Sequence, residues 1–207
     1  METNHLINLQ AVYKHFPMGR GIFTALSDIN LGLEKGEFAG LVGPSGSGKT
    51  TLLNIIGSLD NPSEGDAVVM GENIRGLNAK ESAKLRKAHL GFIFQSFNLL
   101  PVYNVFENVE FPLLLLDIDS GKRRKMVNDA LEWVGLTSKM KSKPSMLSGG
   151  ECQRVAIARS MVKRPELVLA DEPTANLDAE NSHNILQTMV QLNKELNTIF
   201  LFATHYE

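Results

Sequence analysis

The chain of 207 residues has an ordinary globular composition, with 43% hydrophobic residues, 21% charged residues and a formal net charge of -2. This balance excludes a disordered chain and argues against a protein built mainly to bind nucleic acid. The single cysteine, Cys152, excludes an internal disulfide and fits a reducing compartment. The apolar run 111–116 is too short to span a bilayer, and the N-terminus lacks a signal-peptide pattern. We therefore expect a soluble cytoplasmic protein.

The first half of the chain predicts mainly strands. Residues 6–16 and 26–38 alternate apolar and polar side chains roughly with period two, which is typical of antiparallel strands. Residues 37–43 predict a short buried strand, and residues 50–60 predict the helix that follows it. The further predicted elements are a strand at 67–70, a polar helix at 79–88 and a buried strand at 90–94.

The second half alternates helices and strands. Residues 104–135 have a helical pattern, with Pro112 expected as a local interruption and Gly135 as the C-cap. The remaining predicted elements are a strand at 167–170, an amphipathic helix at 179–196 and a buried strand at 198–205. This alternation predicts an α/β core with a mostly parallel sheet, preceded by an N-terminal antiparallel β-subdomain. The stretch from about 96 to 160 is the expected inserted α-helical subdomain of a single domain, 1–207.

Residues 43–50 match the phosphate-binding pattern G-x-x-x-x-G-K-[ST], with a predicted strand before it and a helix after it. The small residues let the backbone wrap a phosphate group, and successive N–H groups donate to it. Lys49 would reach the β- and γ-phosphates, and the Thr50 hydroxyl would bind Mg²⁺. A glycine-rich turn with an exposed lysine is the structural alternative. The predicted nucleotide-binding residues of this P-loop NTPase core are Gly43, Pro44, Ser45, Gly46, Ser47, Gly48, Lys49, Thr50 and Thr51.

Two carboxylates follow the predicted strand at 167–170. Asp171 would lie at the carboxyl end of the sheet, where ligands bind in such folds, and would hold Mg²⁺ from the far side. Glu172 would polarise the water that attacks the γ-phosphate. A charged turn after a strand is common in any protein, so the phosphate loop is what makes this interpretation specific.

The sequence "LSGGE" at 147–151 places a serine and two glycines before a predicted helix, which is a second anion-binding pattern. With these motifs the whole chain resembles the ATP-binding subunits of ABC transporters. The resemblance implies ATP and Mg²⁺ as ligands and a head-to-tail homodimer with composite ATP sites. In such a dimer, Ser148, Gly149, Gly150 and Glu151 of one copy complete the site that contains residues 43–51 of the other. Loss of the γ-phosphate should then open the dimer.

The resemblance also assigns roles to single residues. Phe16 matches the aromatic residue that stacks on adenine, with Tyr13 and Phe23 as alternatives. Asp178 matches the loop that crosses the dimer interface beside the catalytic glutamate.

Two further matches complete the implied catalytic set. Gln95 matches the glutamine that links Mg²⁺ and the attacking water to the membrane partner, and His205 matches the switch histidine at the γ-phosphate. The implied catalytic residues are thus Glu172, His205 and Gln95, and the implied metal ligands are Thr50, Gln95 and Asp171.

Four positions depart from the family pattern. Glu151 replaces the more widespread glutamine, and Cys152 stands where a polar or basic residue is common. Tyr206 follows the switch histidine in place of the usual aspartate. The chain ends at Glu207 where relatives continue, which predicts a trimmed or naturally short C-terminus.

Other ATPase classes fit less well. ABC ATPases of DNA repair insert a long coiled coil between the two anion-binding motifs, and ribosome-associated members carry two such domains in one chain. Kinases and GTPases with a phosphate loop do not need "LSGGE", and the guanine-binding pattern N-K-x-D does not occur.

Residues 92–114 resemble the branch that contains LolD, which serves lipoprotein release, MacB, which serves macrolide and peptide efflux, and the division-associated FtsE. This implies a separate membrane permease as partner, on the cytoplasmic face of the inner membrane, and no nucleic acid.

Phe97, Leu99, Leu100 and Val102 are apolar residues in a predicted loop. They either pack under the helical subdomain or line a groove for a permease helix, for which we expect region 96–110. An FtsE-like regulatory role is the alternative, and the cargo stays open.

Overall fold

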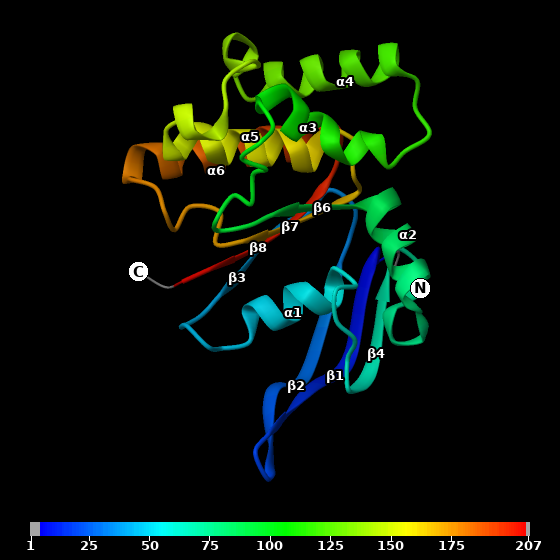
Figure 1. The fold of residues 1–207 in the computed structure, drawn as a ribbon. Coiled ribbons are helices and arrows are strands. Elements are labelled where there is room, and N and C mark those ends of the chain that lie inside the picture. Colours follow the sequence, from blue (N-terminus) through cyan, green and yellow to red (C-terminus); the bar gives the residue numbers. More distant parts are fainter. Residues whose placement is uncertain (1–4, 206–207) are drawn as a thin grey trace.

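The computed structural model describes residues 5–205, which form two sheets and six α-helices in that range (Figure 1). The first sheet is antiparallel, with strand order β2-β1-β4-β5. The long β1–β2 hairpin extends away from the helices. These strands are β1 (Ile7–Met18), β2 (Gly21–Leu33), β4 (Glu64–Val69) and β5 (Glu72–Asn73).

The second sheet is parallel throughout, with strand order β3-β8-β7-β6. Because parallel strands end at the same edge, the loops that follow them meet there. The phosphate loop follows β3, and Gln95, Glu172 and His205 follow β6, β7 and β8. These are the segments in which the sequence predicts nucleotide binding and hydrolysis. The strands are β3 (Phe38–Val42), β6 (Leu90–Ile93), β7 (Leu167–Asp171) and β8 (Ile199–Thr204).

The helices cover both faces of the parallel sheet. α1 lies on one face, and α3, α4, α5 and α6 gather on the other (Figure 1). Three short 3₁₀ turns at Ile74–Gly76, Thr137–Lys139 and Pro144–Met146 connect the larger elements. The α-helices are α1 (Lys49–Ile56), α2 (Ala79–His89), α3 (Val105–Leu114), α4 (Ser120–Trp133), α5 (Gly149–Met161) and α6 (Ala179–Leu196).

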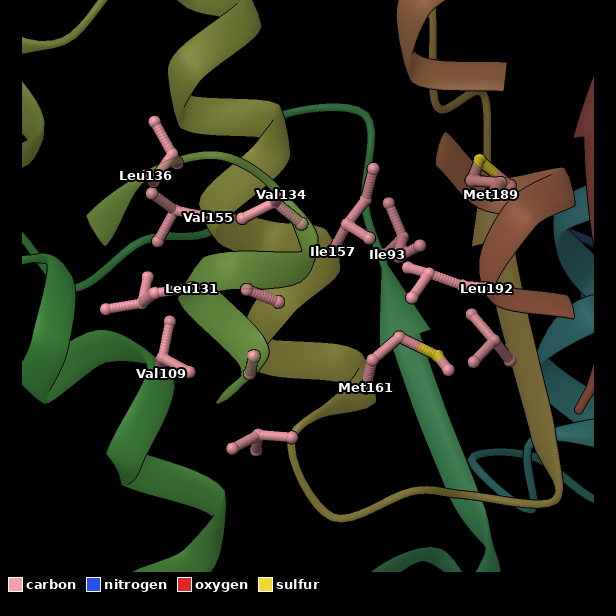
Figure 2. Close-up of a cluster of buried hydrophobic side chains, with 14 of the residues drawn as sticks. Ile93, Val109, Leu131, Val134, Leu136, Val155, Ile157, Met161, Met189 and Leu192 are labelled. Atoms are coloured by element: carbon pink, nitrogen blue, oxygen red, sulfur yellow. The ribbon is translucent and has the colours of Figure 1, made fainter. Parts of the chain in front are cut away.

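Two buried clusters hold these layers together. One joins α1 to both sheets, and the other joins α3, α4, α5 and α6 to the parallel sheet. Figure 2 shows the second cluster, where Val155 faces Leu131 of α4 while Ile157 faces Ile93 of β6. Each fully buried aliphatic side chain of this kind contributes roughly 1.5–3 kcal/mol of transfer free energy. α5 is thus buried on several sides, and its apolar residues Val155, Ala156, Ile157, Ala158 and Met161 are all fully buried.

Gly135 adopts the predicted C-cap geometry, with φ +68° and N–H bonds from Gly135 and Leu136 to the carbonyls of Glu132 and Leu131. The expected interruption at Pro112 was wrong, because α3 continues to Leu114.

Buried side chains on both sides of Pro112 hold this last turn of α3 in place. Leu113 lies in the hydrophobic cluster, and the Asn108 amide donates to the carbonyls of Leu100, Tyr103 and Asn104. Because α5 shares one cluster with the sheet and with α3 and α4, the subdomain boundaries at about 96 and 160 stay a prediction. Within the described range 5–205, no helix combines the length and apolar character needed to cross a membrane.

Candidate nucleotide-binding site

A pocket of about 590 Å³ lies at the carboxyl edge of the parallel sheet. It brings together the phosphate loop and the side chains that follow β6, β7 and β8, together with two aromatic residues of the β1–β2 hairpin. The residues that line it are Phe16, Phe23, Ala25, Ser45, Gly46, Ser47, Gly48, Lys49, Thr50, Thr51, Gln95, Glu172 and His205.

The phosphate loop between β3 and α1 needs glycine for steric reasons. Gly48 has φ +91°, and a Cβ there would lie 2.6 Å from the Ala25 carbonyl oxygen. No side chain caps the first turn of α1, so its N–H groups stay free to donate to an anion. The Lys49 ammonium lies at the loop and donates to the carbonyls of Gly43 (2.7 Å) and Pro44 (2.9 Å). This is the geometry of a phosphate-binding loop.

Two of the three predicted metal ligands are in contact. The Thr50 hydroxyl donates to Asp171 Oδ2 at 2.9 Å, and Gln95 lies at the same pocket. Among residues 5–205, no group of three or more His, Cys, Asp or Glu side chains is placed to hold a metal. A hydroxyl, one carboxylate and an amide suit Mg²⁺, which binds through one or two carboxylates and completes its shell with phosphate oxygens and water.

The Glu172 carboxylate and the His205 ring are in direct contact, through Oε1 and Nε2. Glu172 adopts the left-handed backbone conformation, φ 49°, and its N–H donates to the Ala203 carbonyl at 3.0 Å. A non-glycine residue in this region is uncommon and occurs often at functional sites. The carboxylate is mostly shielded from solvent yet lines the pocket, where it can accept a proton from a bound water.

Residues 148–150 do not line this pocket. Ser148 caps α5, where its hydroxyl accepts from the Glu151 N–H (3.2 Å) and the Glu151 carboxylate accepts from the Ser148 N–H (2.8 Å). That backbone hydrogen bond, with help from Lys139, holds the pKa of Glu151 below its usual range. A Cβ at Gly150 would lie 2.5 Å from Asn181 Oδ1, so α5 and α6 approach closely here.

Comparison with known proteins decides the family. The family model described as ABC transporter matches residues 26–175. YtrE of Bacillus subtilis (strain 168), an ABC transporter ATP-binding protein, is 43% identical over 97% of this chain and 88% of its own length. The lipoprotein-releasing system ATP-binding protein LolD of Legionella pneumophila (strain Lens) is 41% identical over 97% and 88%. The chain belongs to the ABC transporter family.

A solved structure supports the same assignment for the fold. The dimer of the ATP-binding cassette MJ0796, in a post-hydrolysis state with ADP and Pi, matches with a TM-score of 0.88 at 40% identity. The match covers 97% of this chain and 88% of that one. The expected fold class is confirmed, and the protein is an ATP-binding cassette whose reaction is ATP hydrolysis.

The structure distinguishes the three aromatic candidates in the cassette. Phe16 and Phe23 line the pocket, whereas Tyr13 does not and lies against His15. Asp178 caps α6, and the Asn181 N–H that donates to it at 2.8 Å keeps the pKa of this carboxyl below its usual range. Tyr206 lies outside the described residues.

Gln153 of α5 is a site residue that was not predicted from the sequence. This buried side chain donates from Nε2 to the Pro173 carbonyl at 2.6 Å, which ties α5 to the residue after Glu172. Its Oε1 atom has no partner among the described residues. A polar residue on a buried helical face was the available signal, but the chain alone does not show what it contacts.

The loop after Gln95 is held by Arg159 of α5. The guanidinium donates to the carbonyls of Phe97 and Asn98, both of which adopt positive φ. Burial lowers the pKa of Arg159. Of the four apolar residues in this loop, Leu99 packs against the buried cluster and Val102 is exposed.

A second cleft, of about 360 Å³, opens beside this loop. Of the predicted region 96–110, only Asn98 lines it. Four cationic side chains line it together with apolar side chains, and its lining contains no carboxylate. Burial lowers the pKa of one of the cations, Lys163, to about 8. The residues that line it are Leu59, Arg86, Lys87, Leu90, Gly91, Phe92, Phe94, Asn98, Phe111, Pro112, Leu115, Arg159, Ser160 and Lys163.

Proposed function

We propose that the cassette is the ATP-hydrolysing subunit of a membrane transporter and that it acts as a head-to-tail homodimer. The observation that carries this is the separation of two anion-binding motifs. The nucleotide pocket contains the phosphate loop, Gln95, Glu172 and His205, but not residues 148–150. A second copy can supply those residues. The Ser148 hydroxyl accepts from Glu151, so its own hydrogen is free to donate to a phosphate.

The chemistry assigned to each side chain follows from its position. Mg²⁺, held by Thr50, Asp171 and Gln95, would neutralise charge on the β- and γ-phosphates. Lys49 would bind the same phosphates. Glu172 would accept a proton from water as its oxygen attacks the γ-phosphorus.

The products then follow from the bond that breaks. The bond from the γ-phosphorus to the β–γ bridging oxygen breaks, which releases ADP and phosphate. His205, in contact with the Glu172 carboxylate, would orient it and donate to the γ-phosphate.

Mixing two inactive variants tests the composite site. Lys49→Ala removes a phosphate contact, and Ser148→Arg blocks the anion-binding segment 147–151, so each pure variant should lose activity. A mixed dimer contains one intact site, so the mixture should recover a clear fraction of wild-type turnover. Subunit exchange is checked separately by labelling each variant with a different fluorophore. No recovery despite demonstrated exchange would contradict the composite site.

We further infer that a permease docks at the cleft of about 360 Å³, which is lined by cationic and apolar side chains, and at the neighbouring region 96–110. This contact would lie on the cytoplasmic face of the cell membrane. LolD, a relative at 41% identity, is named as part of a lipoprotein-releasing system. Arg159 supports this assignment because it lines the cleft and also holds the loop after Gln95. A partner helix that moves Arg159 would therefore reach the pocket residue Gln95 through this loop.

A further inference from the structure

The turn that follows α1, residues 58–61, is in contact with both the cleft and the β1–β2 hairpin. Leu59 in this turn lines the cleft of about 360 Å³. Asp60 Oδ1 and the Asn61 carbonyl accept from the Lys14 ammonium of β1, at 2.6 Å and 2.8 Å. The turn therefore borders the cleft on one side and is hydrogen-bonded to the hairpin on another.

Lys14 connects this turn to the nucleotide pocket. Its side chain is buried, and its ammonium lies 5.0 Å from the centroid of the Phe16 ring, which lines that pocket. A cation at this distance over an aromatic ring is attracted to it. Because one ammonium group contacts both the turn and the ring, a displacement of the turn is passed to Phe16.

Arg86 of α2 holds the same turn from the cleft side. Arg86 lines the cleft, and its guanidinium donates to the Ser58 carbonyl at 2.6 Å. Ser58 adopts a positive φ of 51°, and its buried Oγ has no hydrogen-bond partner among the described residues. A backbone of this kind persists only where the surrounding structure over-determines it. The bond from Arg86 is thus one of the contacts that keep the turn in its strained form.

The turn lies at the opposite end of α1 from the phosphate loop, and packing separates the two ends. Leu53, Ile55 and Ile56 of α1 are buried in the cluster that joins this helix to both sheets. A close-packed helix resists displacement. A change in the turn should therefore reach the hairpin through Lys14 more readily than it reaches the phosphate loop.

We propose that the turn 58–61 couples the cleft to the affinity for nucleotide, with Arg86 and Lys14 as its two positioning residues. The inference rests on the proposed nucleotide site and on the proposed docking of a permease at the cleft. It adds a second route to the one through Arg159, and this route acts on the binding of the nucleoside part of ATP.

Competition for Arg86 provides the mechanism of this coupling. A carboxylate of the docked partner would bind the guanidinium more strongly than the neutral Ser58 carbonyl does, and would draw it away from the turn. The turn would relax, Lys14 would hold Phe16 less firmly, and the affinity for the nucleoside would fall. The phosphates would stay bound to the loop that precedes α1.

Two methionine variants test the route on the purified chain, with isothermal titration calorimetry as the measurement. Arg86→Met and Lys14→Met each keep an unbranched stem but remove the donor, so the Kd for ATP should rise about fivefold in both. The Kd for inorganic tripolyphosphate, which has no nucleoside, should stay unchanged. Arg86→Lys should restore most of the affinity for ATP, because an ammonium also donates to a carbonyl.

Lys84→Met is the matched control. Lys84 is an exposed cation of the same helix as Arg86 and lines neither the nucleotide pocket nor the cleft. Its replacement should leave both dissociation constants unchanged.

The double variant distinguishes one shared route from two independent ones. If Arg86 and Lys14 act through the same turn, the double methionine variant should raise the Kd for ATP no more than the larger single change. Multiplication of the two effects, to about 25-fold, would overturn the coupling. An unchanged Kd for ATP in either single variant would overturn it as well. So would an equal loss of tripolyphosphate binding, which would show a general loosening of the fold.

Lys49→Ala keeps this test separate from the proposed nucleotide site. It should weaken the binding of both ATP and tripolyphosphate, because Lys49 is assigned to the phosphates. Indifference of both ligands to Lys49→Ala would overturn the nucleotide site rather than the turn.

Discussion

Glu172 combines an unusual backbone conformation with a close side-chain partner. Its left-handed φ of 49° is held by the N–H bond to Ala203 in β8, and its carboxylate contacts His205. Strain of this kind persists only where the surrounding structure over-determines it. The carboxylate that would act as the base is thus positioned before nucleotide arrives.

Replacing Glu172 with glutamine tests that role. Gln keeps the shape of the side chain but cannot accept the proton, so ATP turnover should fall at least about a hundredfold while ATP still binds. An ATP-bound dimer should then accumulate, as measured by size-exclusion chromatography with and without ATP. Undiminished turnover in the purified variant would contradict the assignment.

Lys163 makes the stability of the cassette depend on pH. Burial lowers its pKa from 10.5 to about 8 in the folded protein. Between these values the unfolded chain binds more protons than the folded one, so this residue's unfavourable contribution to folding diminishes as pH rises through that window. The free energy of unfolding of the wild type, relative to Lys163→Met, should therefore increase from about pH 7 to about pH 9.5. Urea denaturation of both proteins at each pH measures this. A difference that does not change with pH would contradict the assignment.

At the scale of elements, α5 touches three functional loops. Its N-terminus carries Ser148, Gln153 contacts Pro173 beside Glu172, and Arg159 contacts the loop after Gln95. A buried helix moves as a unit, since its side chains are packed on several sides. α5 therefore connects three segments: its own N-terminal residues 147–151, the loop that carries Glu172 and the loop after Gln95.

Gln153→Leu tests this coupling. The amide is only half satisfied, since its Oε1 lacks a partner among the described residues, so its loss should cost little stability. The Pro173 carbonyl would lose its donor, and the loop that carries Glu172 would be held less firmly. We expect kcat to fall about tenfold with a small change in KM.

Thermal unfolding and steady-state kinetics on the same sample measure both effects. Gln191→Leu, which removes an exposed glutamine on α6, is the control. A lower melting temperature with unchanged kcat would show that Gln153 is merely structural.

At the scale of the whole molecule, the cassette has two surfaces that suit a binding partner. One is the N-terminal end of α5 with Ser148, Gly149 and Gly150, which do not line the chain's own nucleotide pocket. The other is the cationic cleft, whose four positive side chains have no carboxylate beside them in the lining. We propose that a second copy fills the first surface and that a membrane subunit fills the second.

A pair of neighbouring leucines tests the cleft. Leu115 lines it and is 60% exposed, whereas Leu114 is 52% exposed and does not line it. Leu115→Asp should abolish most co-purification with the permease from membranes and retain nucleotide binding, because a docked partner would have to bury the new carboxylate against apolar side chains, which is costly. Leu114→Asp should behave as wild type. Equal co-purification of the two variants would place the docking site elsewhere.

Local chemistry made much of this fold predictable. The helix predicted at 179–196 matches α6, and the C-cap at Gly135 was confirmed, because periodicity and cap residues act over a few neighbours. The phosphate loop was likewise recognisable, since only glycine fits the backbone at Gly48. The interruption expected at Pro112 failed because packing of Leu113 and the Asn108 hydrogen bonds outweighed the local preference of proline.

The sequence by itself determined the motifs, the strand and helix pattern, and the residue types at the site. Only the tertiary structure decided which of them meet. The strand order β3-β8-β7-β6 brings four loops to one pocket, and the β1–β2 register places Phe16 and Phe23 there while Tyr13 stays out. The partner of Gln153 and the cationic cleft also appear only in three dimensions. The physical reason is that these contacts join residues far apart in the chain, where local periodicity carries no information and packing of the sheet and helices sets the distances.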